Sequence, residues 1–299
     1  MQAKKFANSA KTLGLFVVMW LIIMAIGGAI AGGTGNATWI WVFAGIGVIS
    51  TFVSYWNSAT MALKAMRAYQ VTPHQAPELY RIVSELSSEL KMPMPTVWIA
   101  PTQSPNAFAT GRNPKNAAVC CTEGILQILD ERELRGVLGH ELMHVYNRDI
   151  LTASVAAAMS GIISSLAQFA LMFGGGRGRN NSGGGNIISS LLMVILAPMA
   201  AAVVRMAISR TREYSADQGG ADLTGEPMAL ARALQKISGG VNVRPMASSP
   251  EKDTVSAMMI ANPFRGGGMQ RLFSTHPPME DRVERLAQQA RSLGLDPGN

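Results

Sequence analysis

The sequence GVLGHELMHVYNRD, residues 136–149, decides the interpretation of this chain. It contains two of the four histidines, His140 and His144, and Glu141 directly follows the first. Residues four apart lie on the same face of an α-helix, so both imidazoles can reach one metal ion. Glu141 lies about 100° around the helix from His140, where it can reach a ligand of that ion but is poorly placed to bind it. His-Glu-x-x-His on a helix therefore predicts a zinc site with Glu141 as general base.

A third ligand is expected, because catalytic zinc sites commonly have three protein ligands and one open position. The best candidate downstream is Glu213, in the segment SRTREYSADQ. Asp217 lies one turn further on the same helical face, where it can orient a ligating histidine through its other ring nitrogen. In the alternative, Glu213 only pairs with Arg210 or Arg212 on an exposed face.

The composition predicts an integral membrane protein that carries a soluble part. Only 15% of the residues are charged, well below the share usual in soluble domains, and the mean hydropathy is positive. A bilayer core needs about 20 apolar helical residues, and the sequence contains four uncharged apolar runs of about this length. Two alternatives stay open: a cleaved signal peptide for the first apolar run, and buried helices of a soluble core for the last two, which are rich in Ala, Gly and Ser. The four uncharged runs are 12–31, 38–56, 150–173 and 187–204.

Basic residues predict the orientation of the chain. Three lysines precede the first run, and Lys64 and Arg67 follow the second. Positive residues favour the cytoplasmic side, so the amino terminus and everything after residue 57 should face the cytoplasm in a multi-pass membrane protein. The net charge of +7 is then explained by anchoring at the lipid surface, and we expect no nucleic-acid partner. The adjacent cysteines, Cys120 and Cys121, form no disulfide framework and fit a reducing compartment.

The zinc hypothesis constrains the last two apolar runs. The histidines precede them and Glu213 follows them, so a shared ion requires both flanking segments to lie on one side of the membrane. The runs would then cross as a hairpin inserted at 150–204. Their connection, 174–185, is glycine-rich, and it carries Arg177 and Arg179 but no acid, which is unusual for an outward-facing loop. A hairpin that does not fully cross is the alternative.

The soluble part is expected to combine helices with a few short strands. We expect two capped or amphipathic helices at 77–90 and 279–293, and Asp130 as the cap of the helix with the histidines. The Gly/Pro/Ser-rich stretch 239–268 is expected to be loose. Strands are expected at 96–100 and 117–122, with a brief extended piece at 107–110.

Four segments together resemble the HtpX family of membrane zinc metalloproteases, relatives of the CAAX prenyl proteases. They are GHELMHVYNRD, SRTREYSADQGGADLTG, SPNAFATG and FSTHPPMEDRVERL, and the resemblance extends over nearly the whole chain. It implies a mainly α integral membrane protein with four apolar helices and a zincin-like α+β metallopeptidase domain with a small sheet. Its domains would be two transmembrane helices at 1–57, a cytosolic protease domain at 58–149 and 205–299, and the hairpin at 150–204.

The resemblance also implies an activity. It implies an inner-membrane endopeptidase, active on the cytosolic side, that hydrolyses misfolded or damaged membrane proteins with one Zn²⁺ per chain. His140, His144 and Glu213 would bind the zinc and Glu141 would be the catalytic base. Partners would be protein substrates and the lipid bilayer; the oligomeric state is not predicted.

Further residues acquire roles only through this resemblance. Asn106, Ala107, Phe108 and Ala109 would form the edge strand of a zincin, which can hold an extended peptide by main-chain hydrogen bonds. Two further residues would lie near the active site as transition-state stabilisers, although a role at the start of a helix is equally compatible with the first of them. They are His276 and Arg282.

Three other functions are weaker interpretations of this sequence. An intramembrane protease would place the motif inside an apolar span, but Arg132, Arg135 and Arg148 flank it here, too many charges for hydrocarbon depth. A membrane scaffold or chaperone with structural zinc would need four protein ligands, often cysteines, and the two cysteines are distant in sequence from the motif. Processing of prenylated proteins is a variation within the enzyme class, for which four spans leave little to build a chamber.

Overall fold

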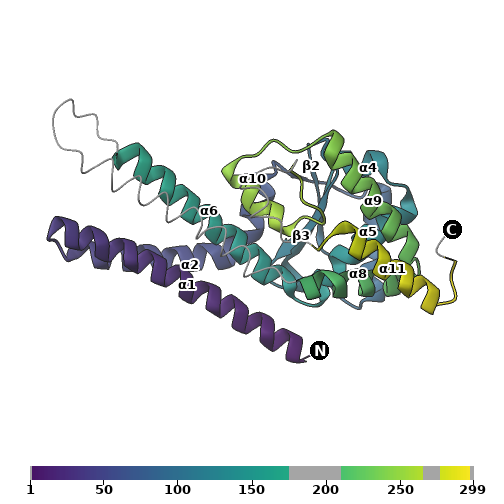
Figure 1. The fold of residues 1–299 in the computed structure, drawn as a ribbon, viewed down its shortest axis with the longest axis horizontal. Coiled ribbons are helices and arrows are strands. Elements are labelled where there is room, and N and C mark those ends of the chain that lie inside the picture. Colours follow the sequence, from purple (N-terminus) through teal and green to yellow (C-terminus); the bar gives the residue numbers. More distant parts are fainter. Residues whose placement is uncertain (1, 175–209, 265–276, 297–299) are drawn as a thin grey trace.

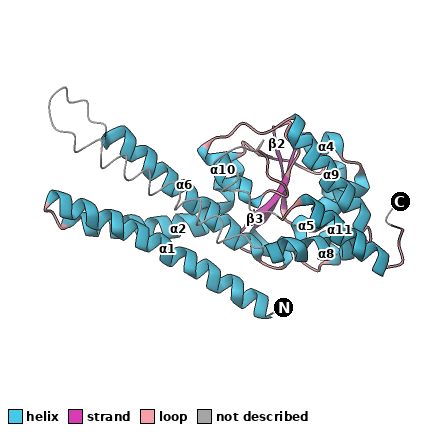
Figure 2. Ribbon diagram, in the orientation of Figure 1, coloured by secondary structure: helices cyan, strands magenta, loops and turns pink. Residues whose placement is uncertain are grey.

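The computed structural model describes residues 2–174, 210–264 and 277–296. Three long helices extend to one side of a rounded body in which helices surround a small sheet (Figure 1). The fold is mostly helical, with its few strands inside the body (Figure 2). In chain order the elements are α1 (Gln2–Thr34), α2 (Thr38–Ala65), β1 (Tyr69–Gln70), α3 (Pro77–Glu89), β2 (Thr96–Ala100), β3 (Ala107–Gly111), η1 (Pro114–Asn116), β4 (Ala117–Thr122), α4 (Glu123–Ile128), α5 (Glu131–Tyr146), α6 (Asp149–Gly174), α8 (Arg210–Thr224), α9 (Pro227–Val243), α10 (Pro250–Val255), η2 (Ser256–Met258) and α11 (Met279–Ser292).

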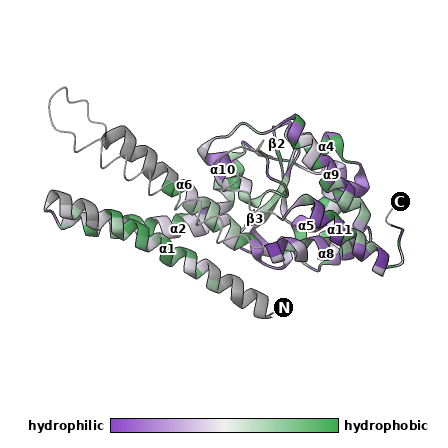
Figure 3. Ribbon diagram, in the orientation of Figure 1, coloured by the Kyte–Doolittle hydropathy of each residue, from purple (hydrophilic) through white to green (hydrophobic). Residues whose placement is uncertain are grey.

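The extended helices α1, α2 and α6 pack against one another through apolar side chains. Met19 of α1, Phe43 of α2 and Met159 of α6 belong to the same buried cluster. The outer faces of α1 and α2 nevertheless expose large apolar side chains, among them Trp41 and Ile49. In Figure 3 the middle of α2 and the neighbouring part of α1 are coloured hydrophobic, whereas the body contains both hydrophilic and hydrophobic residues. Exposed apolar surface of this extent marks a membrane or protein contact.

The number of membrane spans is only partly described. Of the residues that the structure describes, α2 is the one helix that is long and apolar enough to cross a membrane. α1 and α6 contain shorter apolar stretches, at Thr12–Gly28 and Asp149–Ile163. The fourth apolar run, 187–204, and residues 175–185 of the glycine-rich connection lie outside the described residues. Four spans therefore stay a prediction.

The sheet is mixed and separates two cores. Its strand order is β1-β2-β4-β3, with β2 and β4 parallel and the other pairs antiparallel. Because side chains alternate across a strand, Val97, Ala109 and Val119 face one core, which is shared with α3, α5 and α9. Phe108 and Cys120 face the opposite core, formed with α2, α6 and α10. The sheet thus joins the extended helices to the helix that carries the two histidines.

The expected elements of the body are largely confirmed. Strands β2 and β4 have the predicted bounds, and the extended piece at 107–110 is strand β3, one residue longer. Asp130 caps α5: its Oδ1 accepts from the backbone N–H of Glu133 at 2.9 Å, and the Glu133 carboxylate accepts from the N–H of Asp130 at 3.1 Å. Such a reciprocal capping box fixes the start of a helix. The short strand β1 was not predicted.

The segment 239–268 is not loose as far as residue 264, so that expectation was wrong. α9 continues to Val243, α10 and η2 follow, and the residues from Val255 to Ala261 are all buried. The backbone N–H of Ile260 donates to the carbonyl oxygen of Ala107 in β3 at 3.0 Å. Glycine, proline and serine dominate the stretch as a whole, but the apolar run VSAMMIA within it packs against the sheet.

The two cysteines are predicted to be chemically inert in the folded protein. Both are free and completely buried in β4, and burial is the main cause that raises the pKa of Cys121 to about 12. Since the thiolate is the reactive form, we expect no modification by a maleimide at pH 8 until the chain is denatured. A cysteine introduced at exposed Ser292 serves as the positive control; labelling of native Cys120 or Cys121 at the same rate would contradict the prediction.

Candidate active site

Two helices from distant parts of the sequence meet at glycines. On α5, Gly139 lies next to His140 in the sequence. On α8, Gly220 lies so close to α5 that an added Cβ would be 2.7 Å from the backbone nitrogen of His140. A side chain at this position would push α8 away from α5. The close approach brings Glu213, at the start of α8, to the two histidines of α5.

The three predicted ligands converge. The Nε2 atoms of His140 and His144 lie 3.2 Å apart, and the Glu213 carboxylate oxygens lie 3.8 Å from the first and 3.6 Å from the second. Tetrahedral ligands at about 2.0–2.1 Å from zinc are separated from one another by about 3.4 Å. The observed separations match that spacing, so these three side chains form a cluster able to bind a metal ion.

The outer nitrogen of each histidine faces a carboxylate. Nδ1 of His140 lies 2.9 Å from Asp217, as predicted for an orienting residue, and Nδ1 of His144 lies 3.3 Å from Asp149. A carboxylate at Nδ1 fixes the tautomer that leaves Nε2 free to bind a metal, which is the usual arrangement around zinc. Burial lowers the pKa of His144, but Asp149, Glu213 and Glu141 outweigh it and raise the pKa to about 9. The site thus attracts a cation, either a proton or a metal.

The partner of His144 was missed in the sequence. α5 ends at Tyr146, and Arg148 has a left-handed backbone (φ 61°) that turns the chain into α6. The first residue of α6, Asp149, is thereby folded back onto His144. The only signal was an acid five residues after the histidine.

Removing the charge of Asp149 is predicted to weaken metal binding. In Asp149→Asn the acceptor at Nδ1 of His144 stays but its charge is lost, which typically lowers metal affinity about 10–100-fold. Competition with a chromophoric chelator measures the zinc dissociation constant directly. Asp222→Asn, at an exposed position near the end of α8, is the matched control. Equal affinities in the two variants would show that Asp149 does not support the site.

Arg282 lies behind the ligands, not beside the cavity. Its guanidinium makes two hydrogen bonds to Asp217, at 2.6 and 2.8 Å, and a third to the carbonyl oxygen of Ile260 at 2.8 Å. It is completely buried on the Nδ1 side of His140. This placement does not fit the transition-state role expected of Arg282; it fits a residue that positions Asp217. His276, expected in the same role, lies outside the described residues.

Glu141 has the properties of a general base. It is 1% exposed; no well-aligned hydrogen bond from a described residue reaches its carboxylate oxygens, although the backbone of Ala109 in β3 is close enough to lower its pKa. Burial is the main cause that raises its pKa to about 7, against the opposing effect of His144. A base titrating near neutrality is well matched to proton transfer at physiological pH.

A small cavity lies in front of these groups. Its lining includes Glu141, His144 and Glu213 of the cluster, Ala109 of β3 and Met258 of η2. The volume of about 30 Å³ gives room for a water molecule or two and not for a peptide. Candidate metal ligands, the candidate base and the edge strand therefore all border one cavity.

The four residues expected to bind substrate form β3 and the residue before it. β3 is the last strand in the sheet order, and Ala109 lies beside the cavity. Asn106 is already engaged: its side chain donates to the carbonyl oxygen of Ala261 at 2.8 Å. The side chain of Phe108 is buried in the core on the far face, and its backbone pairs with Cys120 of β4.

The comparisons with known proteins agree with this geometry. The model of peptidase family M48 matches residues 73–290, which include β3, α5, α8 and all but the last two residues of α11. The chain belongs to peptidase family M48. The matched residues make up more than half of the chain and include every candidate site residue named above.

Full-length relatives in this family are HtpX proteases. The chain is 56% identical to a protein named "Protease HtpX homolog" from Pseudarthrobacter chlorophenolicus, over 96% of this chain and 98% of that protein. It is 45% identical to a protein of the same name from Burkholderia thailandensis, over 97% and 99% of the two chains. Among solved structures, the crystal structure of S. mikatae Ste24p is similar, with a TM-score of 0.47 and 18% identity. That alignment covers 96% of this chain and 66% of the Ste24p chain.

Membership of family M48 establishes the class of activity. The chain is a metalloprotease, so the alternative of a scaffold or chaperone is not supported. The resemblance to HtpX proteases and their relatives is confirmed. The roles of the individual site residues, the metal and the substrates follow as proposals.

Proposed function

We propose that this M48 peptidase is a zinc-dependent endopeptidase of the cell (inner) membrane that hydrolyses misfolded or damaged membrane proteins on the cytosolic side. The observation that carries the proposal is the convergence of His140, His144 and Glu213 beside the buried carboxylate of Glu141. Two imidazoles and one carboxylate are a usual ligand set of catalytic zinc and leave one position open.

The residues of this chain would divide the reaction between them. Zinc, when bound, supplies a Lewis acid that activates water and polarises the scissile carbonyl. Glu141 would take up a proton from the attacking water and later deliver it to the departing amine nitrogen. Asp217 and Asp149 would hold the two imidazoles in place from behind.

Substrate would lie extended along β3. Of the residues 106–109, Ala107 and Ala109 have backbones that face away from β4, and they would offer main-chain hydrogen bonds, a mode that recognises backbone rather than sequence. Such recognition suits unfolded segments, whose backbone is not already paired. It therefore supports misfolded proteins as the substrate class.

A membrane location is supported by α1, α2 and α6. The apolar surface of α1 and α2 and the span-length helix α2 suit lipid contact. We propose transmembrane helices within 1–57 and 150–204, and a cytosolic protease domain of residues 58–149 and 205–299. Lys64 and Arg67 at the end of α2, next to the body, favour the cytosolic side for that domain.

One assay in membranes tests both the side of the membrane on which the active site lies and the class of substrate. A reporter membrane protein carries a destabilised domain on either its cytosolic or its periplasmic side, and is expressed with this protein or with Glu141→Gln. We expect cleavage of the cytosolic version alone, its loss with the variant or with a zinc chelator, and its recovery when zinc is returned. Cleavage of the periplasmic version, or equal cleavage of a stably folded reporter, would contradict the proposal.

A further inference from the structure

The cavity at the site contains a guanidinium that the proposed mechanism does not use. Arg212 of α8 precedes Glu213 in the sequence and lines the same cavity as Glu141 and His144. It is the one Lys or Arg among the described lining residues, which also include the carboxylates of Glu141, Asp149 and Glu213. A cation is thus placed where the reacting bond of a substrate has to lie.

One nitrogen of this guanidinium lacks an acceptor. Nη1 of Arg212 is buried, and it has no hydrogen-bond partner in the described part of the chain. A buried donor without an acceptor is costly, and most such groups in folded proteins are paired. Asp149 and Glu213 act on Arg212 as nearby negative charges, which favours keeping it in the cavity. An acceptor brought by a substrate would complete its hydrogen bonds.

Arg282, the other arginine near the ligands, is not available for this purpose. All three of its nitrogens already donate to Asp217 or to the carbonyl oxygen of Ile260, on the side of His140 that faces away from Glu213. Among the described residues, the guanidinium that can meet a substrate oxygen at the cavity is therefore Arg212.

We propose that Arg212 donates a hydrogen bond to the oxygen of the scissile carbonyl as that oxygen becomes negatively charged. Donors placed at a developing oxyanion act only in the transition state and raise kcat. This role rests on the assignment of Glu141 as the base, proposed above.

The step balances without a further reactant. The water oxygen forms a bond to the carbonyl carbon, the π electron pair moves onto the carbonyl oxygen, and one proton of the water passes to Glu141. When the carbonyl re-forms, the C–N bond breaks and the nitrogen takes the proton from Glu141. Arg212 keeps its own protons throughout, and its contact with the oxygen is strongest in between.

The test compares Arg212→Gln with a control variant, Arg210→Gln. Arg210 is exposed and lies two residues earlier on α8, so it loses the same charge away from the cavity. Each full-length protein in detergent is given an internally quenched casein peptide with an amidated carboxyl terminus, and its zinc content is measured. A phosphinic peptide, in which a tetrahedral anion replaces the scissile amide, serves as the inhibitor.

Arg212→Gln is expected to lower kcat by about 10²–10³-fold, the loss typical of one oxyanion donor, with KM nearly unchanged. The inhibition constant of the phosphinic peptide should rise by a similar factor, while zinc content and the Arg210→Gln values stay as in the wild type. Normal kcat, or loss of zinc, in Arg212→Gln would overturn the proposal. So would an effect seen in KM with a free-acid peptide and absent with the amidated one, which would assign Arg212 to a substrate carboxylate.

Arg212→Lys is a second variant that controls for a folding defect in Arg212→Gln. Lysine keeps the charge beside Asp149 and Glu213 but not the planar set of donors. We expect an intermediate kcat, and wild-type kcat together with wild-type phosphinate affinity would overturn the hydrogen-bonding role. A parallel assay of Glu141→Gln separates the two assignments: if that variant hydrolyses the peptide normally, the base assignment fails whatever Arg212→Gln does.

Discussion

Glu141→Gln is expected to lower kcat for peptide hydrolysis by about 10²–10⁴-fold, the contribution typical of a general base. The amide has nearly the shape of the carboxylate but cannot accept the proton of the attacking water. Zinc content should stay at one per chain, because Glu141 is not among the three clustered ligands. Stability should change little, since no well-aligned hydrogen bond from a described residue reaches either carboxylate oxygen.

The measurement is cleavage of a quenched peptide, together with zinc analysis and thermal unfolding of the same sample. Glu131→Gln is the matched control, because Glu131 lies exposed in the first turn of the same helix and pairs with Arg81 at the surface. A Glu141→Gln protein with normal kcat would remove the proposed mechanism. A variant that has lost its zinc would make Glu141 a metal ligand instead.

Arg282→Met is expected to destabilise the folded protein by about 3–5 kcal/mol, the usual effect of removing one partner from a buried ion pair. Burial alone would raise the pKa of Asp217, but Arg282 and His140 outweigh it and lower the pKa to about 2. Without Arg282, a charged carboxylate is left in the interior, and His140 is its remaining partner among the described residues. Zinc affinity should fall as well, because Asp217 orients that histidine.

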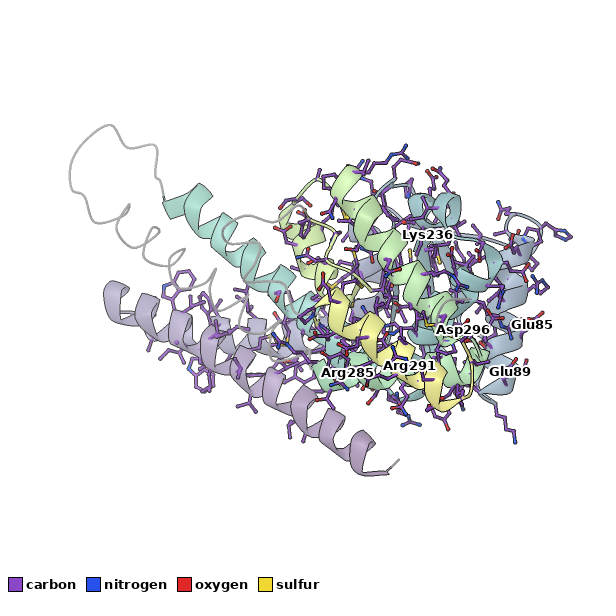
Figure 4. All side chains as sticks on the ribbon, turned by 45° about the vertical axis from the view of Figure 1, so that its right-hand side comes forward. Glu85, Glu89, Lys236, Arg285, Arg291 and Asp296 are labelled. Atoms are coloured by element: carbon purple, nitrogen blue, oxygen red, sulfur yellow. The ribbon has the colours of Figure 1, made fainter. Side chains whose placement is uncertain are left out.

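Chemical denaturation in detergent measures the change in unfolding free energy. Arg291→Met is the control: Arg291 is exposed on the same helix, α11, and Figure 4 shows it at the surface together with Arg285. If Arg282→Met and Arg291→Met unfold at the same denaturant concentration, the buried pair does not hold α11 against α8. A change in zinc affinity alone would restrict Arg282 to positioning Asp217.

The sequence predicted the parts of the site that depend on local spacing. His140 and His144 share a helical face by periodicity, and Asp217 follows Glu213 at one turn on its own helix, so each pair was recognisable without a structure. The strands were recognisable because β-branched and apolar residues lie between turn signals. Glu213 was the best carboxylate downstream, and the two apolar runs between it and the histidines could return the chain to the same side of the membrane.

What was missed depends on chain reversals and on contacts across the fold. Asp149 reaches His144 only because Arg148 adopts a left-handed backbone, and nothing in the spacing requires that. Arg282 was expected near the transition state, but a fully buried arginine is placed by its acceptors, here Asp217 and the backbone of Ile260. The run VSAMMIA was hidden by the glycine- and proline-rich residues around it.

If substrate lies along β3 as proposed, the contacts of that strand would set a threshold before any bond is broken. The carbonyl oxygen of Ala107 is taken by Ile260, and the N–H of Gly111 donates to Ser154 of α6 at 3.2 Å. An incoming polypeptide must exchange these self-contacts for its own, and it can do so only where its backbone is unpaired. A folded domain keeps nearly all of its backbone paired, so on this proposal a loosened segment would displace these contacts more readily than an intact neighbour would.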